Sequence, residues 1–296
     1  MEAIRQGRQT LEQAGITTAL LDAQLLMCHV LKKSRSEMYI GDYPDLTPDQ
    51  YRQYMVLVRE RQDRKPLQYI TQTQEFMGLN FRVVPGVLIP RPDTEILVER
   101  VVEIYNRWYG HGFVRIADIG TGSGVIAVSL AKFIDRCRVW AVDVSDRALA
   151  IARYNADVIG VSPKVEFIPG DLLNALDAQG IGKWDIIVSN PPYIESDLID
   201  SLEPEVSRYE PRQALDGGRD GLRYYRRIIR DCPRVLKPGG YLALEIGHDQ
   251  GLKVLNMMDK DFEDAQCFKD LAGHDRVITG RLKNSVQWSE GRCWKS

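Results

Sequence analysis

Four consecutive residues near the middle of the chain have the types needed to hold a planar nitrogen group. They are Asn190, Pro191, Pro192 and Tyr193. The side-chain oxygen of Asn190 and a main-chain carbonyl, which we expect to be that of Pro191, can accept both N–H bonds of a primary amide or amino group. Because prolines restrict their own φ and extend the residue before them, the acceptors would be in place before a substrate arrives. The flat ring of Tyr193 could stack on the bound group.

Such acceptors suit the transfer of a small electrophile to a poorly nucleophilic nitrogen. The lone pair of an amide nitrogen is delocalised, so the protein must hold that nitrogen in line with the electrophile and favour positive charge on it. No general base is needed before transfer, because the proton leaves a nitrogen that already carries the new group. A tetrapeptide of this kind is usually an ordinary turn, so its position in the fold decides its meaning.

A glycine-rich segment earlier in the chain predicts a nucleotide site. Residues 114–118 predict a strand and residues 125–130 the start of a helix. Between them stand Gly120, Thr121, Gly122, Ser123 and Gly124. A junction of this kind lets a ligand approach the backbone closely at the carboxyl end of a strand. The spacing is G-x-G-x-G, and the dinucleotide fingerprint G-x-G-x-x-G is not met, so a pyrophosphate ligand is disfavoured.

Carboxylates follow three successive predicted strands, at Asp118, Asp143 and Asp171. Asp143 stands roughly 20 residues after the glycines, where an acidic side chain can accept hydrogen bonds from ribose hydroxyls. Leu172 follows Asp171 and could border an adenine. Three strand ends therefore point at one crevice, which predicts an adenosine-type ligand. This set resembles the class I methyltransferase fold, whose cofactor is S-adenosylmethionine, and the resemblance covers residues from about 114 to 282.

Alternating elements must position these residues. Apolar segments that predict strands lie near 114–118, 138–143, 164–168, 184–189, 240–246, 262–268 and 275–281. The first five alternate with helical segments, and the last two form a final pair. The pattern predicts an α/β fold with a Rossmann-like, mostly parallel seven-stranded sheet that is covered by helices on both faces.

The segment ahead of this sheet reads as a separate helical module. Thr47, Pro48 and Gln50 form a predicted capping box for a helix that runs through about Arg61. The module holds no glycine-rich loop and no acid–base cluster, so we expect it to recognise a substrate. The predicted hairpin at 75–86, broken at residues 78–80, serves as a linker. The expected boundaries are a recognition domain at 1–72, a hairpin linker at 73–90, a methyltransferase domain at 91–282 and a tail at 283–296.

Bulk properties narrow the classes of partner. A net charge of -2 lacks the basic excess that usually accompanies tight binding to phosphate backbones, so nucleic acid is not the expected partner. The five cysteines are odd in number and never spaced Cys-x-x-Cys, which disfavours a disulfide framework and a zinc site, and no metal is expected. The same cysteine pattern fits a reducing compartment, so we expect a cytoplasmic location. No apolar run is long enough to span a bilayer, so we expect no membrane association.

Segments outside the two motifs resemble the HemK/PrmC family, the N5-glutamine methyltransferases of peptide chain release factors. They are KPLQYI at 65–70, EFMGL at 75–79, VLIPRPDTE at 87–95, EPRQAL at 210–215, GGRDGL at 217–222 and DLAGHDR at 270–276. The resemblance covers nearly the whole chain. It implies that S-adenosylmethionine methylates the glutamine of the Gly-Gly-Gln motif in a release factor, with the N-terminal helices helping to dock that factor. Leu172 departs from the aromatic residue that some members carry there.

Arg91 and Glu95 have two interpretations. The resemblance implies that they form a wall of the substrate channel, whereas their spacing of one helical turn also suits an ion pair at a helix start. The substrate class has alternatives as well. A nucleic-acid amino methyltransferase shares the tetrapeptide, and four arginines on one predicted helix face would favour it, although such a face is usually only solvated. They are Arg223, Arg226, Arg227 and Arg230. A catalytically inactive adaptor is disfavoured because Asn190 and Asp143 are intact.

Overall fold

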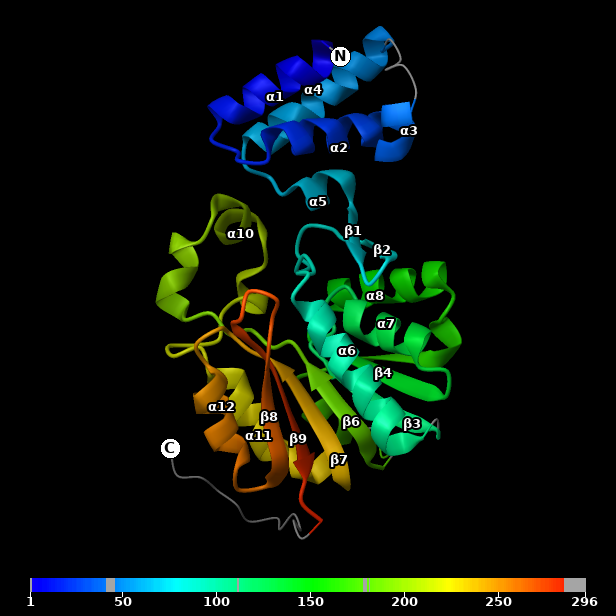
Figure 1. The fold of residues 1–296 in the computed structure, drawn as a ribbon, viewed down its shortest axis with the longest axis vertical. Coiled ribbons are helices and arrows are strands. Elements are labelled where there is room, and N and C mark those ends of the chain that lie inside the picture. Colours follow the sequence, from blue (N-terminus) through cyan, green and yellow to red (C-terminus); the bar gives the residue numbers. More distant parts are fainter. Residues whose placement is uncertain (1, 41–45, 111, 178–179, 181, 285–296) are drawn as a thin grey trace.

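The computed structural model describes residues 2–40, 46–110, 112–177, 180 and 182–284, and it has a helical N-terminal part and a larger α/β part (Figure 1). The N-terminal helices are α1 (Glu2–Gln13), α2 (Ala19–Leu31), α3 (Arg35–Ile40), α4 (Pro48–Gln62) and α5 (Leu67–Thr71). They enclose a core of their own, in which Leu11, Leu26 and Tyr54 are fully buried. The predicted capping box is confirmed: Gln50 N donates to Thr47 Oγ1 over 3.2 Å, and Thr47 N donates to Gln50 Oε1 over 2.9 Å.

A hairpin of two short strands, β1 (Thr73–Phe76) and β2 (Leu79–Arg82), follows the helices. The predicted hairpin is present, but its turn is tighter than the predicted break at 78–80. Only Met77 and Gly78 lie between the strands, both with positive φ, while Leu79 already pairs with Phe76. Two left-handed residues match the twist of a two-residue hairpin, so the chain reverses within them.

The larger part is built on a seven-stranded sheet with the order β5-β4-β3-β6-β7-β9-β8. Its strands are β3 (Val114–Ile119), β4 (Cys137–Asp143), β5 (Val165–Pro169), β6 (Trp184–Ser189), β7 (Leu236–Glu245), β8 (Phe262–Lys269) and β9 (Asp275–Leu282). The first five are parallel, and β9 runs antiparallel to both β7 and β8. The predicted mostly parallel sheet is therefore confirmed. The strand order reverses at β3, and such a switch point is where open α/β sheets bind ligands.

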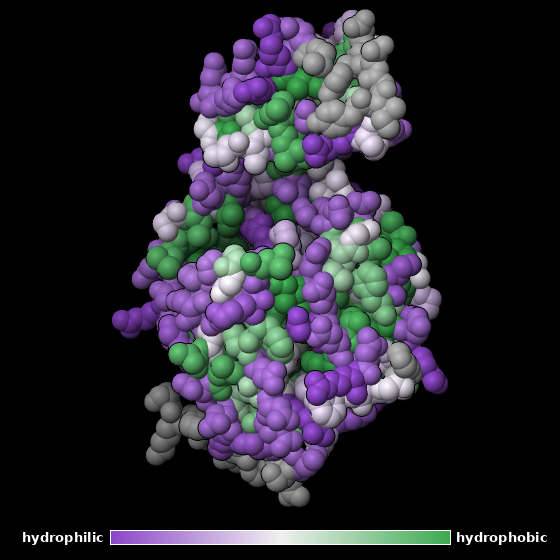
Figure 2. Space-filling model, in the orientation of Figure 1, coloured by the Kyte–Doolittle hydropathy of each residue, from purple (hydrophilic) through white to green (hydrophobic). Residues whose placement is uncertain are grey.

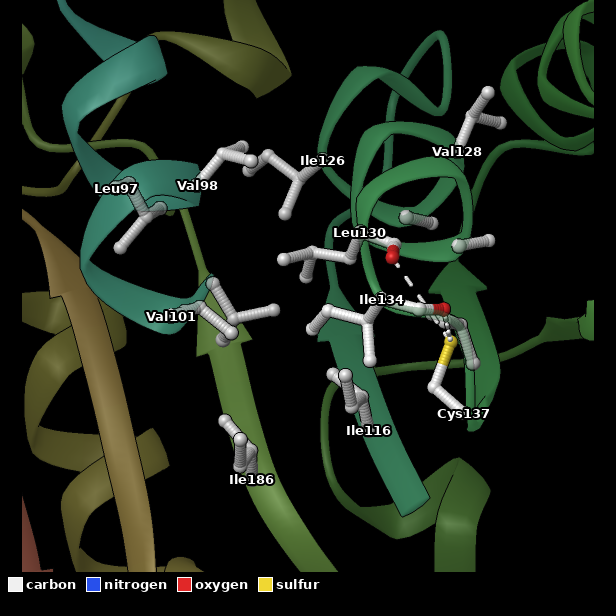
Figure 3. Close-up of a cluster of buried hydrophobic side chains, with 14 of the residues drawn as sticks. Leu97, Val98, Val101, Ile116, Ile126, Val128, Leu130, Ile134, Cys137 and Ile186 are labelled. Carbon is white, nitrogen blue, oxygen red and sulfur yellow. Dashed lines mark hydrogen bonds between the residues drawn. The ribbon is translucent and has the colours of Figure 1, made fainter. Parts of the chain in front are cut away.

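Helices cover both faces of the sheet (Figure 1). They are α6 (Thr94–Ile104), η1 (Tyr105–Tyr109), α7 (Val125–Phe133), α8 (Asp146–Ile159), η2 (Ser162–Lys164), α9 (Asn174–Asp177), η3 (Ser196–Ser201), α10 (Pro204–Tyr209), η4 (Arg212–Ala214), α11 (Arg223–Val235) and α12 (Gly251–Met258). Figure 3 shows α6 and α7 on one face, where Leu97, Val101 and Leu130 pack with Ile116 of β3 and Ile186 of β6. The helices α11 and α12 pack against the other face through Tyr225, Ile228 and Val254. The sheet is thus held rigid beneath its carboxyl edge.

An arginine network links the two parts across a narrow waist that is visible in Figure 2. Arg61 of α4 donates to Asp22 over 2.7 Å and to Glu205 of α10 over 2.8 Å. Arg64 donates to the same Glu205 over 2.8 Å and to Glu203 over 3.1 Å. Since the side chains of Arg61 and Asp22 are buried, losing one partner would leave an uncompensated buried charge, which is strongly unfavourable.

Candidate active site

Both predicted halves of the site line one pocket at the carboxyl edge of the sheet. Among the predicted site residues, the lining includes Arg91, Gly120, Thr121, Gly122, Ser123, Asp143, Asp171, Leu172, Asn190, Pro191 and Pro192. Three predicted site residues, Gly124, Tyr193 and Glu95, are not among the lining residues. The structure therefore brings the glycine turn and the tetrapeptide together and gives those three residues other surroundings.

The glycine turn is supported from beneath by Asp118. This carboxylate is fully buried and accepts hydrogen bonds from Thr121 Oγ1 over 2.6 Å and from Ala127 N over 3.1 Å. Burial raises the pKa of Asp118 to about 7. The sequence predicts that Asp118 points at the crevice, but this residue lies under the turn and does not line the pocket. Its role is to hold the turn against the start of α7.

Gly124 is required for helix packing. It is the N-cap of α7 with a φ of 84°, and a Cβ atom there would lie 2.8 Å from the Cβ of Ala152 on α8. Such a contact is shorter than packed carbon atoms allow, and the positive φ adds strain for any other residue. The third glycine of the motif thus lets α7 and α8 approach each other, and its own position contributes no wall to the pocket.

Asp143 lies at the carboxyl end of β4 and organises the neighbouring backbone. Its Oδ2 accepts from Gly122 N and its Oδ1 from Ser145 N, each over 2.9 Å. Burial raises the pKa of Asp143, and these hydrogen bonds oppose the rise. Each oxygen can still accept a second hydrogen bond, so the carboxylate can hold the glycine turn and a pair of ligand hydroxyls together.

The strand end after β5 contributes a more exposed part of the pocket. Asp171 lines it and forms an ion pair with Arg227 of α11, and Leu172 follows with a φ of 52°. Of the other arginines on that helix face, Arg226 pairs with Asp220 and Arg230 with Asp231. Nearby carboxylates thus neutralise much of the charge on this arginine face. This favours an ordinary solvated surface over a nucleic-acid-binding surface.

The tetrapeptide leaves β6 beside the glycine turn. Asn190 Nδ2 donates to Thr94 Oγ1 over 3.2 Å, which leaves the Oδ1 atom for other partners. The Tyr193 side chain packs with the residues beneath α11 and α12, where burial raises its pKa to about 12. The expected stacking surface at Tyr193 is therefore not part of the lining, whereas Tyr224 of α11 is an aromatic residue that lines the pocket.

The motif at 217–222 packs against the back of the tetrapeptide. Gly217 N donates to Ile194 O over 2.8 Å, and a Cβ atom on Gly217 would lie 2.8 Å from Tyr193 Cα. A Cβ atom on Gly221 would clash with Tyr193 O, and Gln250 Nε2 donates to the carbonyls of both Gly221 and Tyr193. These glycines let two main-chain segments touch, which fixes the path of the chain after Pro192.

We therefore expect Gly217→Ala to lower kcat by about tenfold or more, because displacing the loop by a fraction of an ångström misplaces the acceptors. The melting temperature should also fall, while the Kd for S-adenosylmethionine changes little. Gly160→Ala is the matched control, since a Cβ atom there meets nothing within 4 Å and adds only the strain of its positive φ. A Gly217→Ala enzyme with normal kcat would show that this packing does not matter for the site.

Arg91 and Glu95 have separate partners. Arg91 lines the pocket and forms an ion pair with Glu210 over 2.6 Å, and Ile89 N donates to the same carboxylate over 3.4 Å. Glu95 instead accepts from Met77 N in the hairpin turn over 2.6 Å. The interpretation of Arg91 and Glu95 as an ion pair at the start of a helix is therefore wrong. The linker is instead tied to the segment after the tetrapeptide.

Two residues at or beside the site are not singled out as site residues by the sequence analysis. Thr94 is 2% exposed and lines the pocket next to Asn190, and Glu245 is 1% exposed at the end of β7. A signal for Glu245 exists, since it is an acid at the carboxyl end of a predicted strand, as Asp143 is. Thr94 carries no such signal, because its position depends on how α6 meets the sheet.

Three observations bear on other kinds of site. Within the described residues, no group of three histidine, cysteine, aspartate or glutamate side chains could hold a metal ion. The four cysteines in that part of the chain are free thiols. No described helix is both long and apolar enough to cross a membrane.

Comparison with known proteins gives the family. A family model described as the PrmC N-terminal domain matches residues 2–71, and one described as the methyltransferase small domain matches residues 93–202. The release factor glutamine methyltransferase of Clostridium botulinum is 40% identical, and the match covers 93% of this chain and 96% of the relative. The protein of the same name from Geobacter sulfurreducens is 42% identical over 93% of this chain and 94% of the relative.

Solved structures agree on the fold. The catalytic domain of hMettl16 is 16% identical with a TM-score of 0.54, and the similarity covers 82% of this chain and 84% of that one. A 16S rRNA N2 methyltransferase from T. thermophilus, RsmC, has 18% identity and a TM-score of 0.50, covering 71% of this chain and 50% of that one. Both support a class I methyltransferase sheet. With relatives at about 40% identity over nearly its whole length, the chain belongs to the release factor glutamine methyltransferase family.

Proposed function

We propose that this protein transfers the methyl group of S-adenosylmethionine to the side-chain amide nitrogen of a glutamine in peptide chain release factors. The observation that carries the proposal is a single pocket that joins an adenosine-type half to the tetrapeptide at Asn190. The glutamine is that of the Gly-Gly-Gln motif, as the family resemblance implies. Because the substrate is a translation factor, we expect the reaction in the cytoplasm.

The first half of the pocket fits S-adenosylmethionine. The glycine turn lets a ligand approach the backbone at Gly120 and Gly122, and Asp143 keeps lone pairs for two ribose hydroxyls. Val144 and Leu172 offer apolar walls for an adenine. When bound, S-adenosylmethionine supplies an electrophilic methyl group on a positively charged sulfur.

The second half of the pocket would hold the target amide. Asn190 Oδ1 and the carbonyl of Pro191 accept hydrogen bonds from the two N–H groups. These bonds fix the plane of the amide, so that the nitrogen lone pair, which is perpendicular to that plane, faces the methyl group. Because the two prolines restrict the loop and the segment 217–222 supports it, the acceptors need not reorganise during the reaction. Positive charge that develops on the nitrogen is stabilised by the same two oxygens.

The N-terminal helices are the proposed docking surface for the release factor, with residues 1–72 as the docking domain, 73–90 as the linker and 91–282 as the methyltransferase domain. Leu20 and Leu21 of α2 and Val56 of α4 are exposed on these helices. Figure 2 shows hydrophobic and hydrophilic atoms mixed over the surface of the helical part. A few exposed apolar anchors among polar residues suit a protein partner better than a phosphate backbone.

The substrate can be tested with S-adenosylmethionine that carries a labelled methyl group. Incubation with a purified release factor should label the protein, and a release factor whose Gly-Gly-Gln glutamine is replaced by alanine should remain unlabelled. Duplex DNA and RNA are included in parallel reactions. Label on nucleic acid alone would refute the proposal and support the alternative amino methyltransferase.

A further inference from the structure

A buried acid lies directly behind the proposed acceptor. Glu245 is the last residue of β7, and β7 pairs with β6 so that Leu244 is opposite Ser189, the residue before Asn190. Its side chain is 1% exposed and does not line the pocket. The proposed function gives this carboxyl no role, although ionisable side chains are rarely buried so completely without one.

Glu245 is held among polar groups, and no lysine or arginine in the described part of the chain forms an ion pair with it. Burial raises the pKa of Glu245 to about 7, and hydrogen bonds from Thr94 and Asn190 and the nearby charge of Arg276 oppose the rise. Arg276 itself is engaged by Asp270 over 3.0 Å and by Asp93 over 3.1 Å. The Oε2 atom of Glu245 has no hydrogen-bond partner among the described residues. Burying this acid therefore costs folding free energy, and proteins retain such unfavourable buried groups where function requires them.

We propose that Glu245 is a positioning residue that determines which end of the Asn190 carboxamide faces the pocket, an inference that rests on the proposed function. An ionised carboxylate can only accept hydrogen bonds. Thr94 must then donate its hydroxyl proton to Glu245, so that Thr94 Oγ1 is left to accept from Asn190 Nδ2, as the 3.2 Å contact between them requires. With its NH2 group engaged, the carboxamide presents Oδ1 to the substrate.

The Glu245→Gln variant no longer determines which of these groups donates and which accepts. A glutamine amide can donate to Thr94, whose hydroxyl can then donate to Asn190 Oδ1, and the whole chain of hydrogen bonds reverses. Asn190 would turn its NH2 group toward the pocket, where it would face the NH2 group of the target amide. Two donors cannot pair, so the substrate would lose one of its two acceptors.

The charge on Glu245 also affects stability, and the sign follows from its raised pKa. Between pH 4.5 and about 7 the folded protein holds a proton that the unfolded chain has lost, so the free energy of unfolding falls as the pH rises through that window. The groups that face Glu245 are Arg276 from β9, Asp93 ahead of α6, and Tyr193 and Tyr225 from the tetrapeptide and α11. Glu245→Gln removes the buried charge, so its melting temperature at pH 8 should equal or exceed that of the unaltered enzyme.

The test compares kcat, the Kd for S-adenosylmethionine and the melting temperature at pH 8, with a release factor as substrate. Glu245→Gln should lower kcat by about tenfold or more, because one preorganised acceptor is lost, while the Kd stays within about twofold. In the Asn190→Ala background the same change should cost nothing further, since the two residues act as one unit. Thr94→Val should reproduce the loss, and Thr94→Ser, which keeps the hydroxyl, should restore kcat.

Asp185→Asn is the matched control. Asp185 is also a buried carboxylate of the sheet, but it lies near the opposite end of β6, where it accepts from Arg115 N over 2.9 Å and from Lys237 over 2.7 Å. That variant should lose stability and keep its kcat. The inference is overturned if Glu245→Gln keeps normal kcat, or if it costs as much in the Asn190→Ala background as alone. If the unaltered enzyme leaves release factors unmethylated, the proposed function fails first and takes this inference with it.

Discussion

Asn190→Ala should lower kcat on the order of 10²–10³-fold and leave the Kd for S-adenosylmethionine largely unchanged. The alanine removes the Oδ1 acceptor, so one N–H bond of the target amide has no partner and the nitrogen is free to rotate away from the methyl group. Single-turnover kinetics with a saturating release factor measure this step directly. Asn190 forms hydrogen bonds with Thr94 and Glu245, so the variant also removes a hydrogen-bond partner from each of these two residues.

Asn106→Ala provides the comparison. Asn106 is an exposed residue of η1 that does not line the pocket, so its replacement should change neither kcat nor cofactor affinity. Near-normal turnover by Asn190→Ala would reject the acceptor model, whatever its effect on substrate binding. A loss confined to KM would mean that Asn190 holds the substrate equally in the ground state and the transition state.

Asp143→Ala should weaken the binding of S-adenosylmethionine by roughly 10²-fold, as measured by calorimetry, because two hydrogen bonds from ribose hydroxyls to a charged group are lost. The effect has a second source in the structure. Asp143 accepts from Gly122 N and Ser145 N, so its removal also loosens the glycine turn on which the ligand rests. The kcat at saturating cofactor should fall much less than the affinity.

Two variants separate these contributions. Asp143→Asn keeps one oxygen acceptor and the side-chain shape, so it should bind S-adenosylmethionine with intermediate affinity. Asp146→Ala removes an exposed acid three residues away on α8 and should bind normally. An unchanged Kd for Asp143→Ala would remove this residue from the ribose site and leave it only the task of ordering the turn.

The elements of the fold are those that local patterns predict. Strands that are buried on both faces appear as continuous apolar runs, and the caps and turns between them depend on neighbours within a few residues. The capping box at Thr47 and the junction after Ile119 are of this kind. The hairpin shows the limit of such patterns, since the φ angles of Met77 and Gly78, and not residue type alone, decide where the turn lies.

Side-chain directions within the site could not be predicted, because they depend on contacts between segments far apart in the sequence. Glu95 accepts from the hairpin 18 residues before it, and Arg91 pairs with Glu210, 119 residues later. The Tyr193 side chain packs against the core, while Gly217 and Gly221 lie against its backbone. Asp118 and Asp143 end neighbouring strands, yet only Asp143 reaches the pocket, because the turn folds over Asp118.

The arginine network at Arg61 and Arg64 has a consequence for substrate choice. By joining α4 to Glu203 and Glu205, it sets the span between the N-terminal helices and Asn190 once the chain has folded. A substrate must then place its glutamine at a matching separation from a second patch of its own surface. A short peptide that contains only the Gly-Gly-Gln sequence has no such second patch, so it should be methylated far less efficiently than an intact, correctly shaped factor.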